Sequence, residues 1–333
     1  MKLRRSALIA GLAAVFALAP AVAHAADLYW TNGNTNQIGH AKADGTQVSQ
    51  SYIAAGNAPR AVAALGSYVY WSDGTSISRA LRDGSQAAAT IVTGQTDVEY
   101  LAAYGDYLYW TTTSGTVVRS KLDGSSISPT FIPSMGSALG GIAVDASHIY
   151  FTGLNFIDVA DHSGNILRTI NVFGAGEGLA VSSDYIYFAN GSGASFIGRV
   201  HLDGSGVNDI WLDSNSGVPY DSGSVYGIAI ANSYVYWVHG TPSADRIGRA
   251  PLSDPQNREF DFITGGSGMF DLASNQPAEQ TITFPEISSA SILAGSATLS
   301  ATASSGLPVT YTSNTPAVCV ILDSRATFAT AGT

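Results

Sequence analysis

Apolar residues in this chain gather in short runs that do not alternate with polar residues. Six of these runs end in two aromatic residues: LYW at 28–30, VYW at 69–71, LYW at 108–110, IYF at 149–151, IYF at 186–188 and VYW at 235–237. A strand with one wet face alternates apolar and polar positions. The uninterrupted runs therefore predict strands that are covered on both faces.

The runs recur with a regular spacing. Their final aromatic residues are 41, 39, 41, 37 and 49 residues apart. A small apolar run such as AVAA at 61–64 precedes the aromatic strand, and a third strand such as SISRAL at 76–81 follows it. Asp83-Gly84 then predicts a hairpin into a fourth strand, because Asp-Gly tolerates positive φ. Four short strands in about 40 residues are typical of one blade of a β-propeller.

The two ends of the repeat region complement each other. Residues 28–30 have no small run before them once residues 1–25 are set aside, and the small run at 268–274 has no aromatic strand after it. We expect residues 268–274 to lie beside residues 28–31, because closing the ring removes two free sheet edges. The predicted fold class is all-β: a six-bladed β-propeller over residues 26–276, closed by a C-terminal strand.

Residues 1–25 have the pattern of a signal peptide. A basic start (MKLRR) precedes an apolar run, and the small-x-small sequence AHA ends at Ala25. We expect cleavage near Ala25 and a secreted or cell-envelope-associated protein. The apolar run is short for a membrane anchor and contains Pro20, and no later run is apolar enough to span a bilayer.

The charge of the chain narrows the choice of partners. Three of its 15 basic residues lie in the first 25, which leaves 12 basic against 25 acidic residues and a formal charge of −13. Only two of the remaining cations are lysines, Lys42 and Lys121. Nucleic acids and anionic membranes both require a positive field, so the composition argues against them.

Several aromatic strands continue in a recognisable way. The stretches YWTN at 29–32, YWSD at 70–73 and YWTT at 109–112 are followed by third strands such as Ile77-x-Arg79-Ala80. They resemble the YWTD repeats of LDL-receptor class B propellers over about three quarters of the chain. The resemblance implies a six-bladed propeller that serves as a binding or spacing module, and it implies no catalytic residues.

The composition of the chain changes after Asn275. Residues 277–333 are rich in Thr and Ser, and ATASSGLPVTYTSNTPAVC at 301–319 is similar to a bacterial immunoglobulin-like repeat. With 57 residues this segment is short for a sandwich of roughly 100 residues, so we expect a partial or truncated module. Cys319 is the one cysteine of the chain and cannot form an intrachain disulfide; we expect an orphan buried thiol.

Two kinds of position carry candidate chemistry. An arginine column in the third strands, with His40 in the same column, is expected to pair with carboxylates or carbonyls of its own or the adjacent blade. The residues just before the small strands should lie at one mouth of the central channel, because these strands surround the axis. They are Arg60, Glu99, Gly140, Glu177, Tyr226 and Gly268, and the long loop at 213–227 adds Tyr220 and Asp221.

The mouth residues could simply be solvated loop ends, and two functional interpretations also remain open. The first is a non-enzymatic binding or scaffold propeller that recognises a protein or carbohydrate partner through Arg60, Glu99, Glu177, Tyr220, Asp221 and Tyr226, without a cofactor. The alternative is a hydrolase or lyase with a divalent metal held by Glu99 and Glu177, with Asp221 as base. A metal enzyme requires at least three converging ligands, and the sequence offers two clear carboxylates there.

Overall fold

The computed structural model describes residues 26–190, 196–213, 224–240 and 245–275, and in the C-terminal part residues 282–283, 296–303, 313, 319–322 and 325–328. Residues 25–276 form one compact unit, and the described segments after residue 276 belong to a second unit. The predicted signal peptide lies outside the described residues.

The described part of residues 26–275 forms six four-stranded antiparallel sheets, which are the blades of a β-propeller. Blade 1 contains β24 (Leu272–Asn275), β1 (Asp27–Asn32), β2 (Gln37–Lys42) and β3 (Ser49–Ala54), with the 3₁₀ turn η1 (Gly33–Thr35). Blade 2 contains β4 (Ala61–Leu65), β5 (Tyr68–Ser72), β6 (Ile77–Leu81) and β7 (Ala89–Val92). Blade 3 contains β8 (Val98–Tyr104), β9 (Tyr107–Thr112), β10 (Val117–Lys121) and β11 (Ser128–Ile132). Blade 4 contains β12 (Ile142–Val144), β13 (Ile149–Gly153), β14 (Phe156–Ala160) and β15 (Ile166–Asn171). Blade 5 contains β16 (Ala175–Val181), β17 (Tyr185–Asn190), β18 (Phe196–His201) and β19 (Asn208–Asp213). Blade 6 contains β20 (Val225–Ala231), β21 (Tyr234–His239), β22 (Asp245–Pro251) and β23 (Glu259–Gly266).

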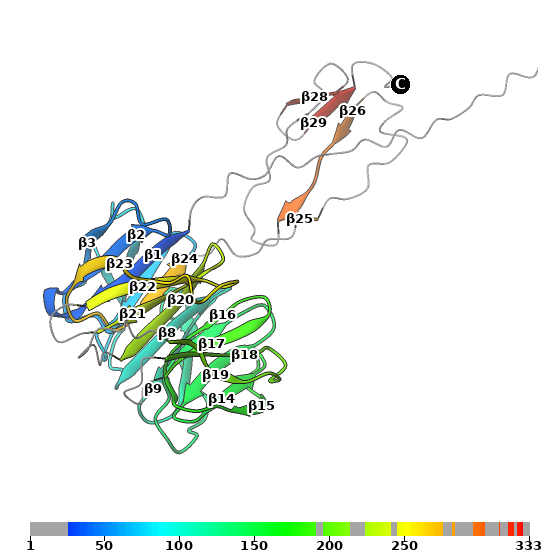
Figure 1. Cartoon of the computed structure of the whole chain (residues 1–333). Coiled ribbons are helices and arrows are strands. Elements are labelled where there is room, and N and C mark those ends of the chain that lie inside the picture. Colours follow the sequence, from blue (N-terminus) through cyan, green and yellow to red (C-terminus); the bar gives the residue numbers. More distant parts are fainter. Residues whose placement is uncertain are drawn as a thin grey trace, which may run out of the picture. The chain divides into compact units, whose positions relative to one another are not determined.

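The ring is closed by strands from the two ends of the propeller. The first strand named for each blade is the inner strand, and the inner strands contact one another in the order β4, β8, β12, β16, β20, β24 and again β4. β24 pairs antiparallel with β1, with Leu272 opposite Trp30, and the two lie side by side in Figure 1. The expected pairing of the two ends is confirmed, but the strand begins at Leu272 and not at Gly268.

The aromatic strands are buried along almost their whole length, as the lack of alternation predicts. Trp71 and Trp110 are at most 1% exposed. In the described residues the core consists of six clusters, and each cluster lies between two neighbouring blades. For example, Tyr150 of blade 4 and Phe188 of blade 5 share one cluster. Because each sheet packs against a core on both faces, its middle strands have no position for a solvated side chain.

Glycines allow the inner strands to approach one another near the axis. A methyl group on Gly178 would lie 2.3 Å from the carbonyl oxygen of Tyr226 in the next blade. A methyl group on Gly227 would lie 2.5 Å from the backbone nitrogen of Leu272. These neighbours are backbone atoms, so a larger residue would displace a strand.

Arginines of this column join blade 2 to blade 3 and blade 3 to blade 4. The guanidinium of Arg119 lies 3.9 Å from the ring centroid of Phe131 and 4.5 Å from that of Tyr107. Its Nη1 donates to the carbonyl oxygen of His162 in blade 4 at 3.2 Å. Arg79 makes the equivalent bond from blade 2 to blade 3. The expected pairing with carbonyls of an adjacent blade is confirmed at these two positions.

The described tail segments are also strands. β25 (Ile282–Thr283) pairs with β27 (Thr302–Ala303), and β29 (Arg325–Phe328) pairs with β26 (Ser296–Thr298) and β28 (Cys319–Leu322). The immunoglobulin-like nature of this segment and the environment of the Cys319 thiol stay predictions. Within the described ranges, no helix combines the length and apolar character that a membrane crossing requires.

Candidate functional site

Strand register places six residues at one end of the central channel. In each blade an inner-strand residue lies opposite the final aromatic residue of the next strand: Val62 opposite Trp71, Leu101 opposite Trp110, Ile142 opposite Phe151, Leu179 opposite Phe188, Ile228 opposite Trp237 and Leu272 opposite Trp30. Two residues before these positions stand Arg60, Glu99, Gly140, Glu177, Tyr226 and Phe270. We call these six residues the mouth ring.

The mouth ring corrects one sequence-based expectation. Gly268 was expected at the sixth position, and this is wrong, because the pairing of β24 with β1 puts Leu272 opposite Trp30. The equivalent residue is therefore Phe270. The other five positions are as expected, whereas Tyr220 and Asp221 lie outside the described residues.

The charged residues of the mouth ring contact partners within the site. Nη2 of Arg60 lies 3.3 Å from Oε2 of Glu99. The hydroxyl of Tyr100 donates to Oε2 of Glu177 at 2.7 Å. Burial raises the pKa of both glutamates. At Glu177 the charge of Glu99 raises the pKa further, whereas the hydrogen bond from Tyr100 and the charge of Arg60 lower it. The structure thus brings Arg60, Glu99 and Glu177 together.

Phe270 supplies an aromatic contact surface at the mouth. Its ring centroid lies 5.3 Å from that of Tyr100 and 5.6 Å from that of Tyr226. The guanidinium carbon of Arg60 lies 5.4 Å from the same centroid. Side chains from three other inner-strand ends therefore meet on the Phe270 ring.

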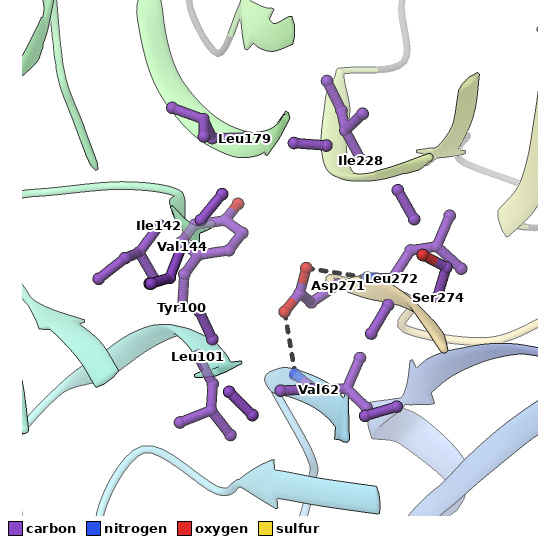
Figure 2. Close-up of a pocket in the computed structure, with 18 of the residues that line it drawn as sticks. Val62, Tyr100, Leu101, Ile142, Val144, Leu179, Ile228, Asp271, Leu272 and Ser274 are labelled. Carbon is purple, nitrogen blue, oxygen red and sulfur yellow. Dashed lines mark hydrogen bonds between the residues drawn. The ribbon is translucent and has the colours of Figure 1, made fainter. Parts of the chain in front are cut away.

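The next residue of each inner strand forms a second ring inside the channel. Its members are Ala61, Tyr100, Gly141, Gly178, Gly227 and Asp271. Only Tyr100 and Asp271 have side chains larger than a methyl group, and both project toward the middle of the channel (Figure 2). From them a cavity of about 210 Å³ extends along the inner strands to Asp145 and Ser274.

Asp271 is a buried acid at the closed end of this cavity. It is 5% exposed, and its carboxylate accepts hydrogen bonds from the backbone nitrogens of Val62 at 2.9 Å and Leu272 at 2.8 Å. Burial raises the pKa of Asp271 to about 7, although the two N–H donors act in the opposite direction.

Sequence reasoning did not single out Tyr100, Phe270 or Asp271. The signal was present, because LAS at 272–274 matches LAV at 179–181. Aligning these two stretches places Phe270 and Asp271 in the same columns as Glu177 and Gly178.

The described residues give no support to a metal centre. Within them, no group of three or more His, Cys, Asp or Glu side chains is arranged to hold a metal ion. The two carboxylates proposed as ligands, Glu99 and Glu177, already contact Arg60 and Tyr100.

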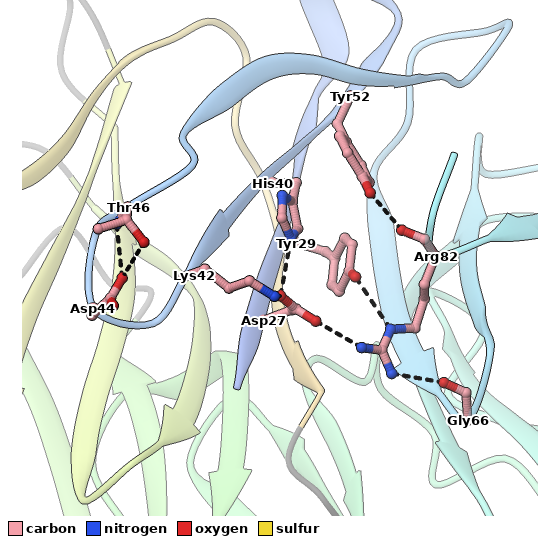
Figure 3. Close-up of polar contacts among 9 residues, drawn as sticks. All are labelled: Asp27, Tyr29, His40, Lys42, Asp44, Thr46, Tyr52, Gly66 and Arg82. Carbon is pink, nitrogen blue, oxygen red and sulfur yellow. Dashed lines mark hydrogen bonds and ion pairs between the residues drawn. The ribbon is translucent and has the colours of Figure 1, made fainter. Parts of the chain in front are cut away.

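A second polar cluster joins blades 1 and 2 (Figure 3). One oxygen of Asp27 lies 2.6 Å from Nζ of Lys42 and 3.1 Å from Nε2 of His40, and the other lies 2.6 Å from Nη2 of Arg82. Arg82 also donates to the hydroxyl of Tyr29 at 3.2 Å. Because every charge in this cluster has a partner inside the protein, we assign it a structural role.

Exposed apolar side chains lie on the face around the mouth ring. Leu154, in the β13–β14 turn, and Phe173, just before β16, are 64% and 65% exposed. The two turns are tied together: Asn155 accepts hydrogen bonds from the backbone nitrogens of Val172 at 3.1 Å and Gly174 at 3.2 Å. Isolated exposed apolar residues are ordinary, but adjacent ones beside a channel mouth indicate a contact surface.

Comparison with known proteins supports the fold. No protein-family model matches this chain, and no curated protein matches its sequence. A chain in the crystal structure of the nidogen–laminin complex is similar over 75% of this chain and 98% of its own length, with a TM-score of 0.57 and 13% identity. A protein of unknown function from Bacteroides caccae is similar over the same shares, with a TM-score of 0.55 and 12% identity. At such identity the likeness concerns the fold alone, and the chain is a β-propeller.

Proposed function

We propose that this chain is an exported binding propeller of the YWTD type, and that it recognises a protein partner on the face around the mouth ring. The pattern of residues 1–25 supports export, and the tail at 277–333 acts as a partial immunoglobulin-like module that associates the propeller with the cell envelope. The YWTD stretches and the rigid closed ring suit a module that presents a surface to a partner.

One observation carries the proposal: Leu154 and Phe173 lie on two turns that are hydrogen-bonded to each other, and both side chains are nearly two-thirds exposed. Burying apolar surface contributes about 25 cal/mol per Å², and fully desolvated aromatic side chains often dominate binding energy. Glu177, a partly buried residue of β16, supplies a polar group at the mouth ring four residues after Phe173. Apolar anchors with a polar rim are the composition that protein interfaces use.

Exposed apolar residues elsewhere offer a matched control. Ile127 and Val207 are each 41% exposed, and they follow the Asp-Gly turns of two different blades. Because they lie on turns of two different blades and not on the mouth face, we expect the partner not to anchor on them.

The test compares two double variants of the chain in capture from a cell-envelope extract, quantified by mass spectrometry. Leu154→Ser with Phe173→Ser is expected to reduce recovery of the wild-type partner at least about tenfold, the effect of losing one binding hot spot. Ile127→Ser with Val207→Ser is expected to leave recovery unchanged. Equal recovery with both double variants, or binding of a glycan array with no protein recovered, would contradict a protein-binding mouth face.

A further inference from the structure

The outer strand of blade 4, β15, has the most regular register among the outer strands of the six blades. Its pairing with β14 runs through four consecutive pairs, from Phe156 opposite Asn171 to Val159 opposite Arg168. In the other five outer strands the register shifts after no more than two consecutive pairs. A shifted strand bends and twists, which hinders pairing with a further strand. β15, the last strand of its sheet (Figure 1), is therefore the outer edge best suited to such pairing.

Backbone groups point outward from this edge. The amide nitrogen of Val172 donates to the carbonyl oxygen of Asn155 at 3.1 Å. These two residues continue the β14–β15 register, and hydrogen-bonded and non-bonded pairs alternate in an antiparallel ladder. Ile170 therefore bonds to β14, whereas the N–H and C=O groups of Thr169 and Asn171 point away from it. Among the described residues, no backbone hydrogen bond to these outward groups is present.

The side chains of β15 leave its edge open. Proteins commonly protect a free edge with a proline, with charged side chains or by keeping the strand short. β11 contains Pro129, β19 contains Asp209, β23 contains Glu259, and β7 has only four residues. β15 has six residues without a proline or an acid, and its Ile166 and Leu167 are 38% and 51% exposed.

The charge of the chain allows a second copy to approach at β15. Residues 26–333 contain 25 acidic and 12 basic residues, so two copies repel each other wherever their acids meet. The single charge of β15 is Arg168. In a two-fold antiparallel pairing about Ile170, Arg168 lies opposite Val172 of the other copy, so like charges are not opposed.

We propose that two copies of the chain associate through β15, in a two-fold antiparallel pairing about Ile170. Thr169 of each copy then lies opposite Asn171 of the other, and each such pair exchanges two backbone hydrogen bonds. Phe173 stays outside the pairing, because its N–H donates to Oδ1 of Asp209 in blade 5 at 2.9 Å. A contact of this size predicts a weak dimer that dissociates on dilution. The dimer does not depend on the proposed protein partner.

The test is sedimentation velocity of the whole chain between about 3 and about 300 µM, where we expect the dimer fraction to rise with concentration. Asn171→Pro removes one outward N–H from each copy and should raise the dimer Kd at least about tenfold. Ala54→Pro is the matched control, because Ala54 lies opposite Gln37 in blade 1 as Asn171 lies opposite Phe156 in blade 4. Its N–H also points outward, since the next residue, Ala55, donates to Asn36 at 2.9 Å. This variant should leave the Kd unchanged.

Hydrogen exchange measures the same contact without a substitution. In mass spectrometry of the wild-type chain, the peptide that covers β15 should exchange more slowly at about 300 µM than at about 3 µM, and the peptide that covers β3 should exchange equally at both. A monomer at every concentration would overturn the proposal. So would a dimer that persists undiminished in Asn171→Pro, or one that Ala54→Pro weakens equally.

Discussion

Substitution of Asp27 by asparagine should destabilise the propeller through charge and not through size. The Asp27 side chain is 9% exposed and contacts Lys42 and Arg82 at 2.6 Å each, and His40 at 3.1 Å. Asparagine has almost the same volume, but it carries no charge and replaces one acceptor oxygen with an amide donor that faces the cations. The variant therefore leaves two cations of adjacent blades without their shared counter-ion.

The expected cost follows from the exposure of these partners. Removing one member of a fully buried ion pair costs about 3–5 kcal/mol. Here the side chains of Lys42 and Arg82 are 29% and 24% exposed, so water recovers part of their solvation. We expect Asp27→Asn to lower the free energy of unfolding at pH 7 by about 2–3 kcal/mol.

The pH dependence of the unfolding free energy distinguishes a loss of charge from a loss of packing. Burial opposes ionisation of Asp27, but the bonds from His40, Lys42 and Arg82 outweigh it and hold the pKa of this carboxyl well below its usual value of 3.8. Its stabilising contribution is therefore complete above the unfolded-state pKa and is lost as the pH falls toward the folded-state pKa. The difference between wild type and Asp27→Asn should shrink from pH 7 to pH 3.

The assay is urea unfolding of both proteins at pH 7, 5 and 3, followed by tryptophan fluorescence. Asp44→Asn is the control, because Asp44 is an exposed acid bonded to Thr46 in the same turn (Figure 3), and its effect should stay within about 0.5 kcal/mol. A deficit in Asp27→Asn that is equally large at pH 3 and pH 7 would refute the electrostatic reasoning, and so would no deficit at pH 7.

Two further predictions concern the contacts between blades. Gly178→Ala should lower the free energy of unfolding in urea by about 1–3 kcal/mol, because its methyl group would meet the Tyr226 carbonyl oxygen. The control Gly176→Ala, in the same strand, meets no atom closer than 3.8 Å and should lower it far less. Equal losses in the two variants would show that the inner strands separate freely. Arg119→Met should lower stability by about 1–2 kcal/mol in thermal melts, because its aromatic and carbonyl contacts are lost. Lys121→Met, at the exposed end of β10, should change stability by less than about 0.5 kcal/mol. A neutral Arg119→Met variant would argue against the arginine column as a link between blades.

Much of the fold was predictable because each blade repeats one local pattern. The uninterrupted aromatic runs indicated strands covered on both faces, and Trp71 and Trp110 are indeed at most 1% exposed. The Asp-Gly turn at 83–84 was readable because Gly84 adopts a φ of +71°, a conformation that glycine tolerates. Such features depend on neighbouring residues in the chain, so the sequence displays them directly.

The candidate site was only partly predictable, because it is assembled from strand ends far apart in the sequence. Arg60, Glu99 and Glu177 were placed correctly at one mouth, since each precedes an obvious small strand. Phe270 was missed because β24 lacks an aromatic strand after it, and its register is decided by pairing with β1.

By itself, the sequence determined the strands, the blade period and the all-β class, because burial on both faces and turn chemistry are local demands on side chains. Only the tertiary structure decided which side chains meet at the axis. Closure of the ring brings Asp271 against Val62, and it brings Asp27 against Arg82. Neither pair has a signal in the repeat, since both arise where one blade packs against the next and where the side chains depart from the repeated pattern.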